Sequence, residues 1–151
     1  MTAPREPGVS KLVDGEAAYY TIRWSALRRP DRHEINSVVP SVPGIYELYY
    51  RDASGSLRLF HVARAWYGGL RNSIRETTDP ELVRNGKHRG LLAEYEIWYR
   101  FAPAGSHGDL SDLMFFFAET YFPRERREEP SGRYADVFVK ETSPDNLIDL
   151  D

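Results

Sequence analysis

The chain has 151 residues, a net charge of −3 at pH 7 and no cysteine, and 41% of its residues are hydrophobic. This length suits one domain with a hydrophobic core and is too short for two ordinary domains. The lack of cysteine excludes a disulfide framework and a thiolate metal site. No apolar run has the length of a membrane span and no apolar signal core is present, so we expect a cytoplasmic protein without a membrane partner.

The charge is unevenly distributed along the chain. Residues 58–100 carry a net charge of +3, whereas all other residues together carry −6. Binding to a phosphate backbone requires positive surface, so the overall charge argues against a general nucleic-acid binder. The positive segment is where a nucleic-acid site is expected, although a solvated surface explains such a mild bias nearly as well.

The N-terminal segments are expected to lead into a sheet. Residues 1–17 are mostly polar, with prolines and glycines, and are predicted to form a flexible arm. Residues 18–24 have the composition of a strand at a sheet edge. Residues 27–36 are charged and interrupted by Pro30, which predicts a loop or one short helical turn. Residues 38–43 are predicted to be extended, because a proline disfavours the α conformation of the residue before it.

A β-hairpin is predicted next. Residues 43–50 and 57–64 are rich in strand-forming residues and flank a small polar turn. A four-residue loop places Tyr46 opposite His61, whereas a two-residue loop places Tyr46 opposite Ala63 with His61 as a diagonal neighbour on the same face. The phenol and the imidazole converge in both registers, and a three-residue loop would separate them.

Helical spacing follows the hairpin. Leu70 and Ile74 lie four residues apart, as the core side of a helix requires, and Arg71 and Arg75 form a second pair beside them. A short second helix is predicted over residues 79–84, because its first two residues are a capping acid and a proline.

The remaining segments alternate between strand and helix. Residues 91–101 end in a clear alternation of apolar and charged residues and predict a strand. Residues 109–122 predict a helix that the following proline ends, with Glu119 beside its apolar stripe. Residues 133–140 have strand character, and the acidic tail over residues 143–151 is expected to be ordered only in part.

These elements predict an α+β fold. A single domain over residues 18–142 would contain a small antiparallel sheet of three core strands, further flanking strands, and helices packed against them. Its central part, residues 43–122, has the element order strand, strand, helix, strand, helix.

Two short motifs in this central part resemble those of a known nuclease family. Gly44-Ile45-Tyr46 opens the first hairpin strand, and His61-Val62-Ala63 lies at the matching position of the second strand. An arginine-bearing helix follows directly. This arrangement resembles the GIY-YIG nuclease family, whose first motif the chain matches letter for letter and whose second motif it matches in position.

The resemblance implies hydrolysis of nucleic-acid phosphodiester bonds, with DNA as the expected partner and one divalent metal ion, Mg²⁺ or Mn²⁺, as cofactor. Tyr46 and His61 would activate or position the attacking water, since imidazole accepts a proton at neutral pH more readily than a phenol. Arg71 or Arg75 would hold the phosphate. Glu119 would bind the metal, together with water and substrate oxygens.

Each of these residues also has an ordinary structural interpretation. Tyr46 and His61 are equally consistent with packed strand residues, and Glu119 with a partly exposed helix residue. His88 and His107 have no partner at the spacing of a zinc site. A metal site made of histidines is therefore not expected.

Two other interpretations of the whole chain stay open. One is a catalytically inactive domain of the same fold that binds nucleic acid, a protein partner or a second copy of itself, with Trp66, Tyr67 and Trp98 as candidate contacts. The other is an unrelated α+β domain in which the tripeptide is coincidental. Geometry distinguishes them, because in a nuclease the tyrosine, the histidine, one helix arginine and the glutamate must line one cleft.

Overall fold

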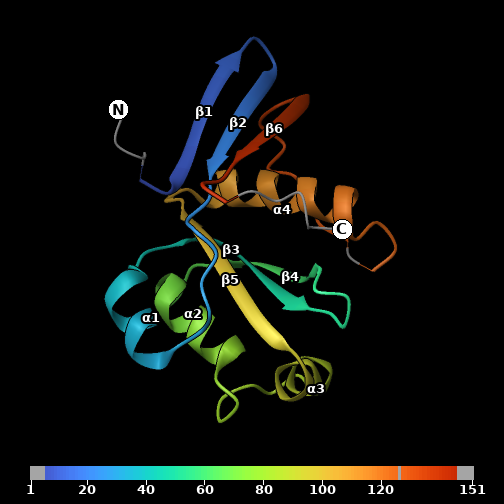
Figure 1. The fold of residues 1–151 in the computed structure, drawn as a ribbon. Helices are drawn as coiled ribbons and strands as arrows, with labels where there is room; N and C mark the ends of the chain where they lie inside the picture. The colour runs from blue at the N-terminus through green and yellow to red at the C-terminus, as the bar shows by residue number, and fades with distance from the viewer. Residues whose placement is uncertain (1–5, 126, 146–151) are drawn as a thin grey trace.

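The computed structural model describes residues 6–125 and 127–145, which form two three-stranded sheets and four helices. In chain order the elements are β1 (Gly8–Asp14), β2 (Ala17–Arg23), α1 (Arg32–Val38), β3 (Gly44–Arg51), β4 (Leu57–Ala65), α2 (Gly69–Thr78), α3 (Gly86–Glu94), β5 (Glu96–Pro103), α4 (His107–Tyr121) and β6 (Asp136–Thr142). Figure 1 shows them in layers: the β1-β2-β6 sheet, then α4, then the β4-β3-β5 sheet, then α1, α2 and α3. The fold class is α+β, as predicted. No helix in the described part of the chain has both the length and the apolar character needed to cross a membrane.

The first sheet begins in a segment that the sequence places in a flexible arm. β1 and β2 form an antiparallel hairpin around Gly15, whose φ of 60° lies in the left-handed region that glycine adopts freely. The prediction of an arm over residues 1–17 is therefore wrong for residues 8–17, while residues 1–5 lie outside the described part. Most of β1 is exposed, so it lacks the apolar alternation that identifies a strand, and its pairing with β2 holds it in place.

The third strand of this sheet comes from the C-terminal part of the chain. The predicted strand over residues 133–140 is observed as β6, which pairs with β2 in parallel. Of the predicted acidic tail, only residues 143–145 are described.

The second sheet has β3 at its centre, with β4 and β5 antiparallel on either side. The first six residues of β3 are buried, because helices cover both faces of the sheet. Tyr46 pairs with Ala63 and Leu48 pairs with His61, which is the register predicted for a two-residue loop. The turn is longer than that, and a β-bulge at Phe60 absorbs the difference.

The first helix lies where a loop or a single turn is predicted. α1 covers the second half of the 27–36 segment and continues past it. Asp31 caps it, since its Oδ1 accepts hydrogen bonds from the backbone N–H groups of His33 and Glu34, each at 3.0 Å. The cap falls directly after the proline that interrupts the sequence pattern.

The third helix is missing from the sequence prediction. In place of the predicted helix over residues 79–84 there is only a turn at residues 80–82. α3 then occupies the beginning of the strand predicted over residues 91–101. Asn85 caps it, since its Oδ1 accepts the backbone N–H of His88 at 3.0 Å. No residue of α3 is buried, so its sequence has no apolar period that would identify a helix.

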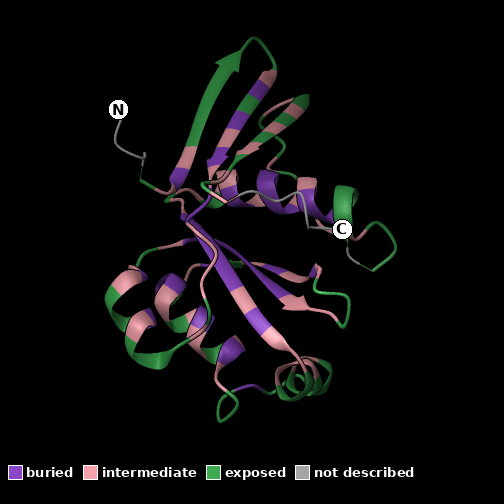
Figure 2. Cartoon of the chain, in the orientation of Figure 1, coloured by how far each residue is buried: buried purple, intermediate pink, exposed green. Residues whose placement is uncertain are grey.

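The last helix, α4, is covered on two sides. Leu110, Leu113 and Phe117 are fully buried, and they share one core with Ile22 of β2 and Ile45 of β3. Figure 2 shows this buried band along α4 between the two sheets. The helix therefore joins the two sheets through a common hydrophobic core.

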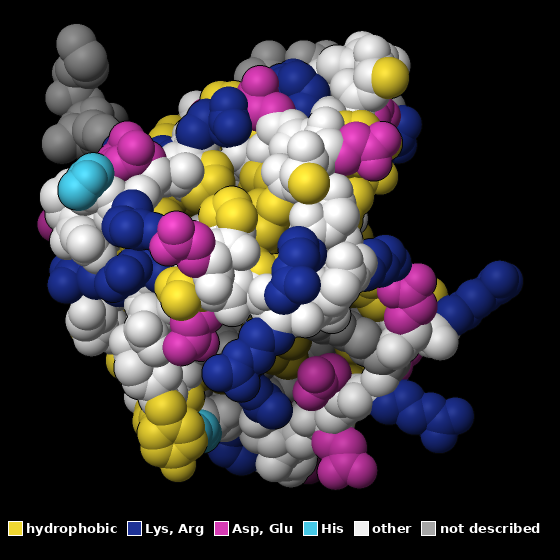
Figure 3. All heavy atoms as spheres, turned by 90° about the horizontal axis from the view of Figure 1, so that it is seen from below, with side chains coloured by type: hydrophobic (Ala, Val, Ile, Leu, Met, Phe, Trp, Pro, Cys, Tyr) yellow, Lys and Arg dark blue, Asp and Glu magenta, His cyan; other side chains and the backbone are white. Residues whose placement is uncertain are grey.

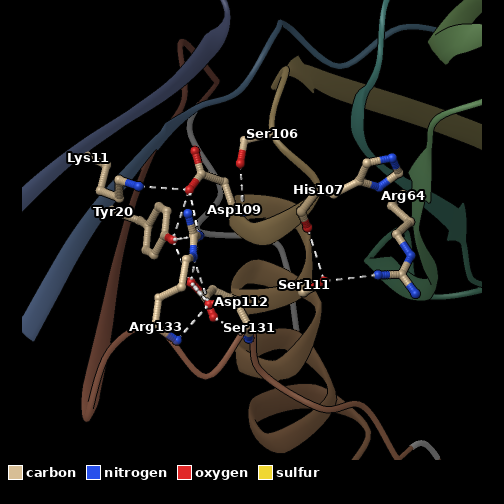
Figure 4. Close-up of polar contacts among 10 residues, drawn as sticks. All are labelled: Lys11, Tyr20, Arg64, Ser106, His107, Asp109, Ser111, Asp112, Ser131 and Arg133. Carbon is tan, nitrogen blue, oxygen red and sulfur yellow. Dashed lines mark hydrogen bonds and ion pairs between the residues drawn. The ribbon is translucent and has the colours of Figure 1, made fainter.

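Asp112 links α4 to β2 and to the segment before β6 (Figure 4). It is 1% exposed and accepts hydrogen bonds from Tyr20 Oη at 2.6 Å, from Ser131 N at 2.8 Å and from Arg133 Nη2 at 3.2 Å. Burial raises the pKa of Asp112, but the hydrogen bonds from Tyr20, Ser131 and Arg133 outweigh burial and hold the pKa below its ordinary value. The ionised carboxylate therefore stabilises the fold.

A buried ion pair joins β3 to β5. Arg100 Nε donates to Glu47 Oε1 at 2.5 Å, and Tyr49 Oη donates to the same oxygen at 2.7 Å. The Arg100 guanidinium lies 4.6 Å from the centre of the Trp24 ring and 3.8 Å from Glu141 of β6. Burial raises the pKa of Glu47, and the charge of Arg100 opposes this only in part. The pair connects the second sheet to the last strand of the first.

We expect Asp112→Asn to lower the free energy of unfolding by about 1–3 kcal/mol at neutral pH, because buried donors lose a charged acceptor. An acid whose pKa is lowered by folding stabilises the fold above its unfolded pKa, and this contribution disappears as the pH falls below about 4. The stability of the variant should therefore depend less on pH between about 5 and 2 than that of the wild type. Urea unfolding followed by circular dichroism measures both quantities. If the free energy of unfolding changed equally with pH in the variant and in the wild type, this would contradict the role assigned to the Asp112 carboxylate.

Candidate functional site

Each residue of the first motif has a structural role. Gly44 lies where β3 approaches β5 and α2 closely, and an added Cβ would be 2.5 Å from the carbonyl oxygen of Ala102 and 2.7 Å from Leu70 Cδ1. Ile45 is fully buried in the core around α4. Tyr46 points to the other face of the sheet, into the core formed with α1 and α2, and is 2% exposed. Packing alone therefore accounts for the tripeptide.

Tyr46 and His61 converge as the sequence predicts. Tyr46 Oη lies 3.4 Å from His61 Nε2, and the two rings meet edge to face with centroids 5.6 Å apart. The contact arises because two strands of one hairpin place both side chains on the same sheet face. His61 is only half-buried, so an anion can reach the imidazole more easily than the buried phenol.

His88 extends this pair into a cluster that the sequence does not predict. Its ring centroid lies 4.8 Å from that of His61 and 5.2 Å from that of Phe60, with edge-to-face geometry in both contacts. The residue sits in the first turn of α3, and the Asn85 cap fixes that turn. A capping asparagine ahead of a short basic segment is the sequence signal that could have revealed both the helix and this histidine.

A cavity of about 420 Å³ adjoins the cluster. Residues from the end of α2 to the start of α3 line it, namely Glu76, Thr77, Leu82, Val83, Arg84, Asn85 and His88. Arg84 and Lys87 are exposed at this place, and no acidic residue occurs between Val83 and Ala93. Figure 3 shows the face formed by α1, α2 and α3, on which many Lys and Arg side chains lie among acidic ones. The start of α3 adds the positive end of a helix dipole.

Arg71 and Arg75 are directed toward α1. Arg71 Nε donates to the carbonyl oxygen of Val39, directly after α1, at 2.8 Å. Arg75 lines a separate cavity of about 230 Å³ that also contains residues of the α1 segment, and its buried Nε has no hydrogen-bond partner in the described part of the chain. Arg71 therefore links α2 to the end of α1, and Arg75 faces the cavity that α2 shares with the α1 segment.

Glu119 lies on the wrong face of the sheet for the implied metal site. It is an exposed residue of α4, and α4 packs on the face of the β4-β3-β5 sheet that carries Ile45 and Val62. Tyr46 points to the opposite face, because successive residues of a strand alternate between faces. The expectation that Glu119 joins Tyr46 and His61 in one cleft is therefore wrong.

The residues present do not fit the implied Mg²⁺ or Mn²⁺ ion at this cluster. Within residues 6–125 and 127–145, no three side chains among His, Asp and Glu are grouped closely enough to hold a metal ion. The carboxylate that the resemblance assigns to the metal is on the far side of the sheet. The arrangement can instead attract an anion, with imidazole groups and exposed cations beside a hollow.

The three aromatic residues considered for protein contacts differ in accessibility. Tyr67 is 90% exposed. Trp66 packs on His107 with ring centroids 3.4 Å apart, and Trp98 donates its indole N–H to Glu96 at 2.7 Å. Only Tyr67 is fully available to a partner.

A protein-family model described as "Uncharacterised protein" matches residues 8–151. The chain belongs to this family. The match extends from β1 through β6 and so includes both sheets. No curated protein and no solved structure matches the chain.

We expect Gly44→Ala to destabilise the protein by about 1–3 kcal/mol, because the new methyl group would overlap backbone and core atoms. Thermal unfolding followed by circular dichroism measures the effect. Gly90→Ala is the matched control, since no atom lies within 4 Å of its added Cβ. In an exposed helix that control should be neutral or slightly stabilising. Equal melting temperatures for the two variants would contradict the packing role of Gly44.

Proposed function

We propose that this protein is a nucleic-acid-binding module with a GIY-YIG-like core and without metal-dependent catalysis. The observation that carries the proposal is the pair formed by His61 and His88 beside a 420 Å³ cavity that Arg84 and Glu76 line, with the exposed Lys87 next to His88 in the chain. DNA or RNA phosphates would bind there.

The order of elements supports a relation to that fold. From β3 to α4 the chain runs strand, strand, helix, helix, strand, helix, with β3 in the middle of the sheet. Apart from α3, this is the order on which the resemblance rests. The additional helix carries His88 and Lys87, and Arg84 lies directly before its cap.

The distribution of charge supports an anionic ligand at this place. Arg84 and Lys87 are exposed, whereas the nearest preceding acids, Asp79 and Glu81, pair with Arg32 at 2.9 Å and 3.3 Å. Arg84 and Lys87 therefore place positive charge beside the cavity, where Glu76 is an acidic lining residue. Binding through such cations releases counterions from the nucleic acid and weakens as salt rises.

We expect the double variant Arg84→Glu/Lys87→Glu to bind a labelled oligonucleotide roughly tenfold more weakly, and to reduce the slope of log affinity against log salt by about 2. Fluorescence anisotropy at several salt concentrations, with single-stranded and duplex DNA and RNA, measures both effects. The control is Arg124→Glu/Arg127→Glu, which changes the charge equally at exposed positions after α4.

Two results would contradict the binding proposal. The first is a wild type that binds none of these oligonucleotides at low salt. The second is an equal loss of affinity in both double variants, which would assign binding to the overall charge and not to α3.

GIY-YIG-like hydrolysis of phosphodiesters is the second candidate, and the contact between Tyr46 and His61 favours it. In that function His61 would take a proton from water or from the phenol. The low exposure of Tyr46 opposes it, because water and phosphate must reach the reacting groups.

A plasmid-nicking assay with Mg²⁺ or Mn²⁺ separates the two candidates. We expect no nicking by the wild type, and no change on Glu119→Ala, because that carboxylate lies on the other side of the sheet. Nicking that Tyr46→Phe abolishes would favour the hydrolase. If Glu119→Ala abolished nicking, this would contradict the position of Glu119 on the opposite side of the sheet from Tyr46 and His61.

A further inference from the structure

The outer face of the β1-β2-β6 sheet has no covering element in the described part of the chain. Ala18, Tyr20 and Ile22 of β2 are buried toward α4, so the residues between them face away from the helix. Figure 1 shows α4 on only one side of this sheet. The opposite side is a candidate interaction surface.

Three large apolar side chains form one row across this face. Leu12 pairs with Tyr19, and Tyr19 pairs with Phe138, so the three lie side by side on successive strands. They are 69%, 44% and 50% exposed, and the rings of Tyr19 and Phe138 are stacked with centroids 5.0 Å apart. An ordered apolar row on a bare sheet marks an interaction site.

Charges of opposite sign flank the row along the strand direction. On β6, Lys140 lies two residues after Phe138 and Asp136 lies two residues before it. Asp14 lies on the same side of the row as Asp136, because Asp14 pairs with Ala17 and Ala17 pairs with Asp136. Neither Lys140 nor Asp136 forms an ion pair with any residue that the structure describes.

We propose that a second copy of this chain docks on this face, with the two-fold axis parallel to the Leu12–Tyr19–Phe138 row. Such an axis reverses the strand direction and lays each β6 over its counterpart. The apolar rows then meet, and Lys140 of each copy faces Asp136 of the other. An axis parallel to the strands would instead bring Asp136 over Asp14, where like charges repel.

Nucleic acid fits this face less well. A surface that binds single strands combines stacking aromatics with an excess of positive charge. Here Arg23 and Lys140 are balanced by Asp14 and Asp136, and Arg23 already donates to Ser10. One face of each stacked ring is also closed to a nucleobase, because the other ring covers it.

The size of the face indicates a weak, reversible dimer. Three strands of seven residues form a sheet of about 14 Å by 23 Å. The buried area, about 300 Å² per copy, is therefore below that of stable specific interfaces and in the range of weak, transient contacts. Two sheets packed face to face at about 10 Å would exclude water from the aromatic row.

Sedimentation velocity over a hundredfold range of protein concentration tests the proposal. We expect a concentration-dependent monomer–dimer equilibrium in the wild type. Lys140→Asp and Asp136→Lys alone should each weaken the dimer roughly tenfold or more, because like charges then face each other. The double variant Lys140→Asp/Asp136→Lys should restore it. Arg124→Asp and Glu129→Lys are the matched controls at exposed positions outside the sheet.

Several outcomes would overturn the proposal. A wild type that stays monomeric at every concentration excludes the dimer. If the single charge reversals leave the dimer intact, this interface is excluded. It is also excluded if the double variant does not restore the dimer. Melting temperatures of all variants separate lost association from lost folding. Oligonucleotide binding that Phe138→Ser abolishes in a monomeric wild type would assign the face to nucleic acid, and none of these results depends on the α3 site.

Discussion

The burial of α4 between two sheets is the constraint on which the rest of the structure depends. The helix contributes Leu110, Leu113 and Phe117 to a core that includes strands of both sheets, and desolvation of this apolar surface is the main stabilising term. Polar groups trapped nearby must be paired. Asp112 therefore collects hydrogen bonds from three residues, and Glu47 is matched by Arg100.

The same constraint determines where a functional site can be. Because α4 occupies one face of the β4-β3-β5 sheet, its carboxylates are separated from the face that carries Tyr46 and His61. In the described part of the chain, residues for chemistry on that second face come from β3, β4, β5 and the helices α1 to α3. These elements supply imidazoles and cations, and in the described part no three side chains among His, Asp and Glu are grouped closely enough to hold a metal ion.

Strong local patterns in the sequence predict much of this arrangement. The hairpin, the apolar stripe of α2, the helix around Phe117 and the convergence of Tyr46 with His61 all follow from alternation or helical period. β1 and α3 do not, because both are largely exposed and are held by pairing or capping instead of an apolar period. The face on which Glu119 lies depends on which sheet side α4 covers, and periodicity within one helix carries no information about that.

The parallel pairing of β2 with β6 has a consequence for the order in which the protein assembles. β2 ends at Arg23 and β6 begins at Asp136, so their partnership closes a loop of more than one hundred residues. Contacts between such distant segments carry a large entropic cost and form late. The sheet of β1, β2 and β6 should therefore stay incomplete after the β1–β2 hairpin has formed, and this leaves the free edge of β2 open to misassembly during folding.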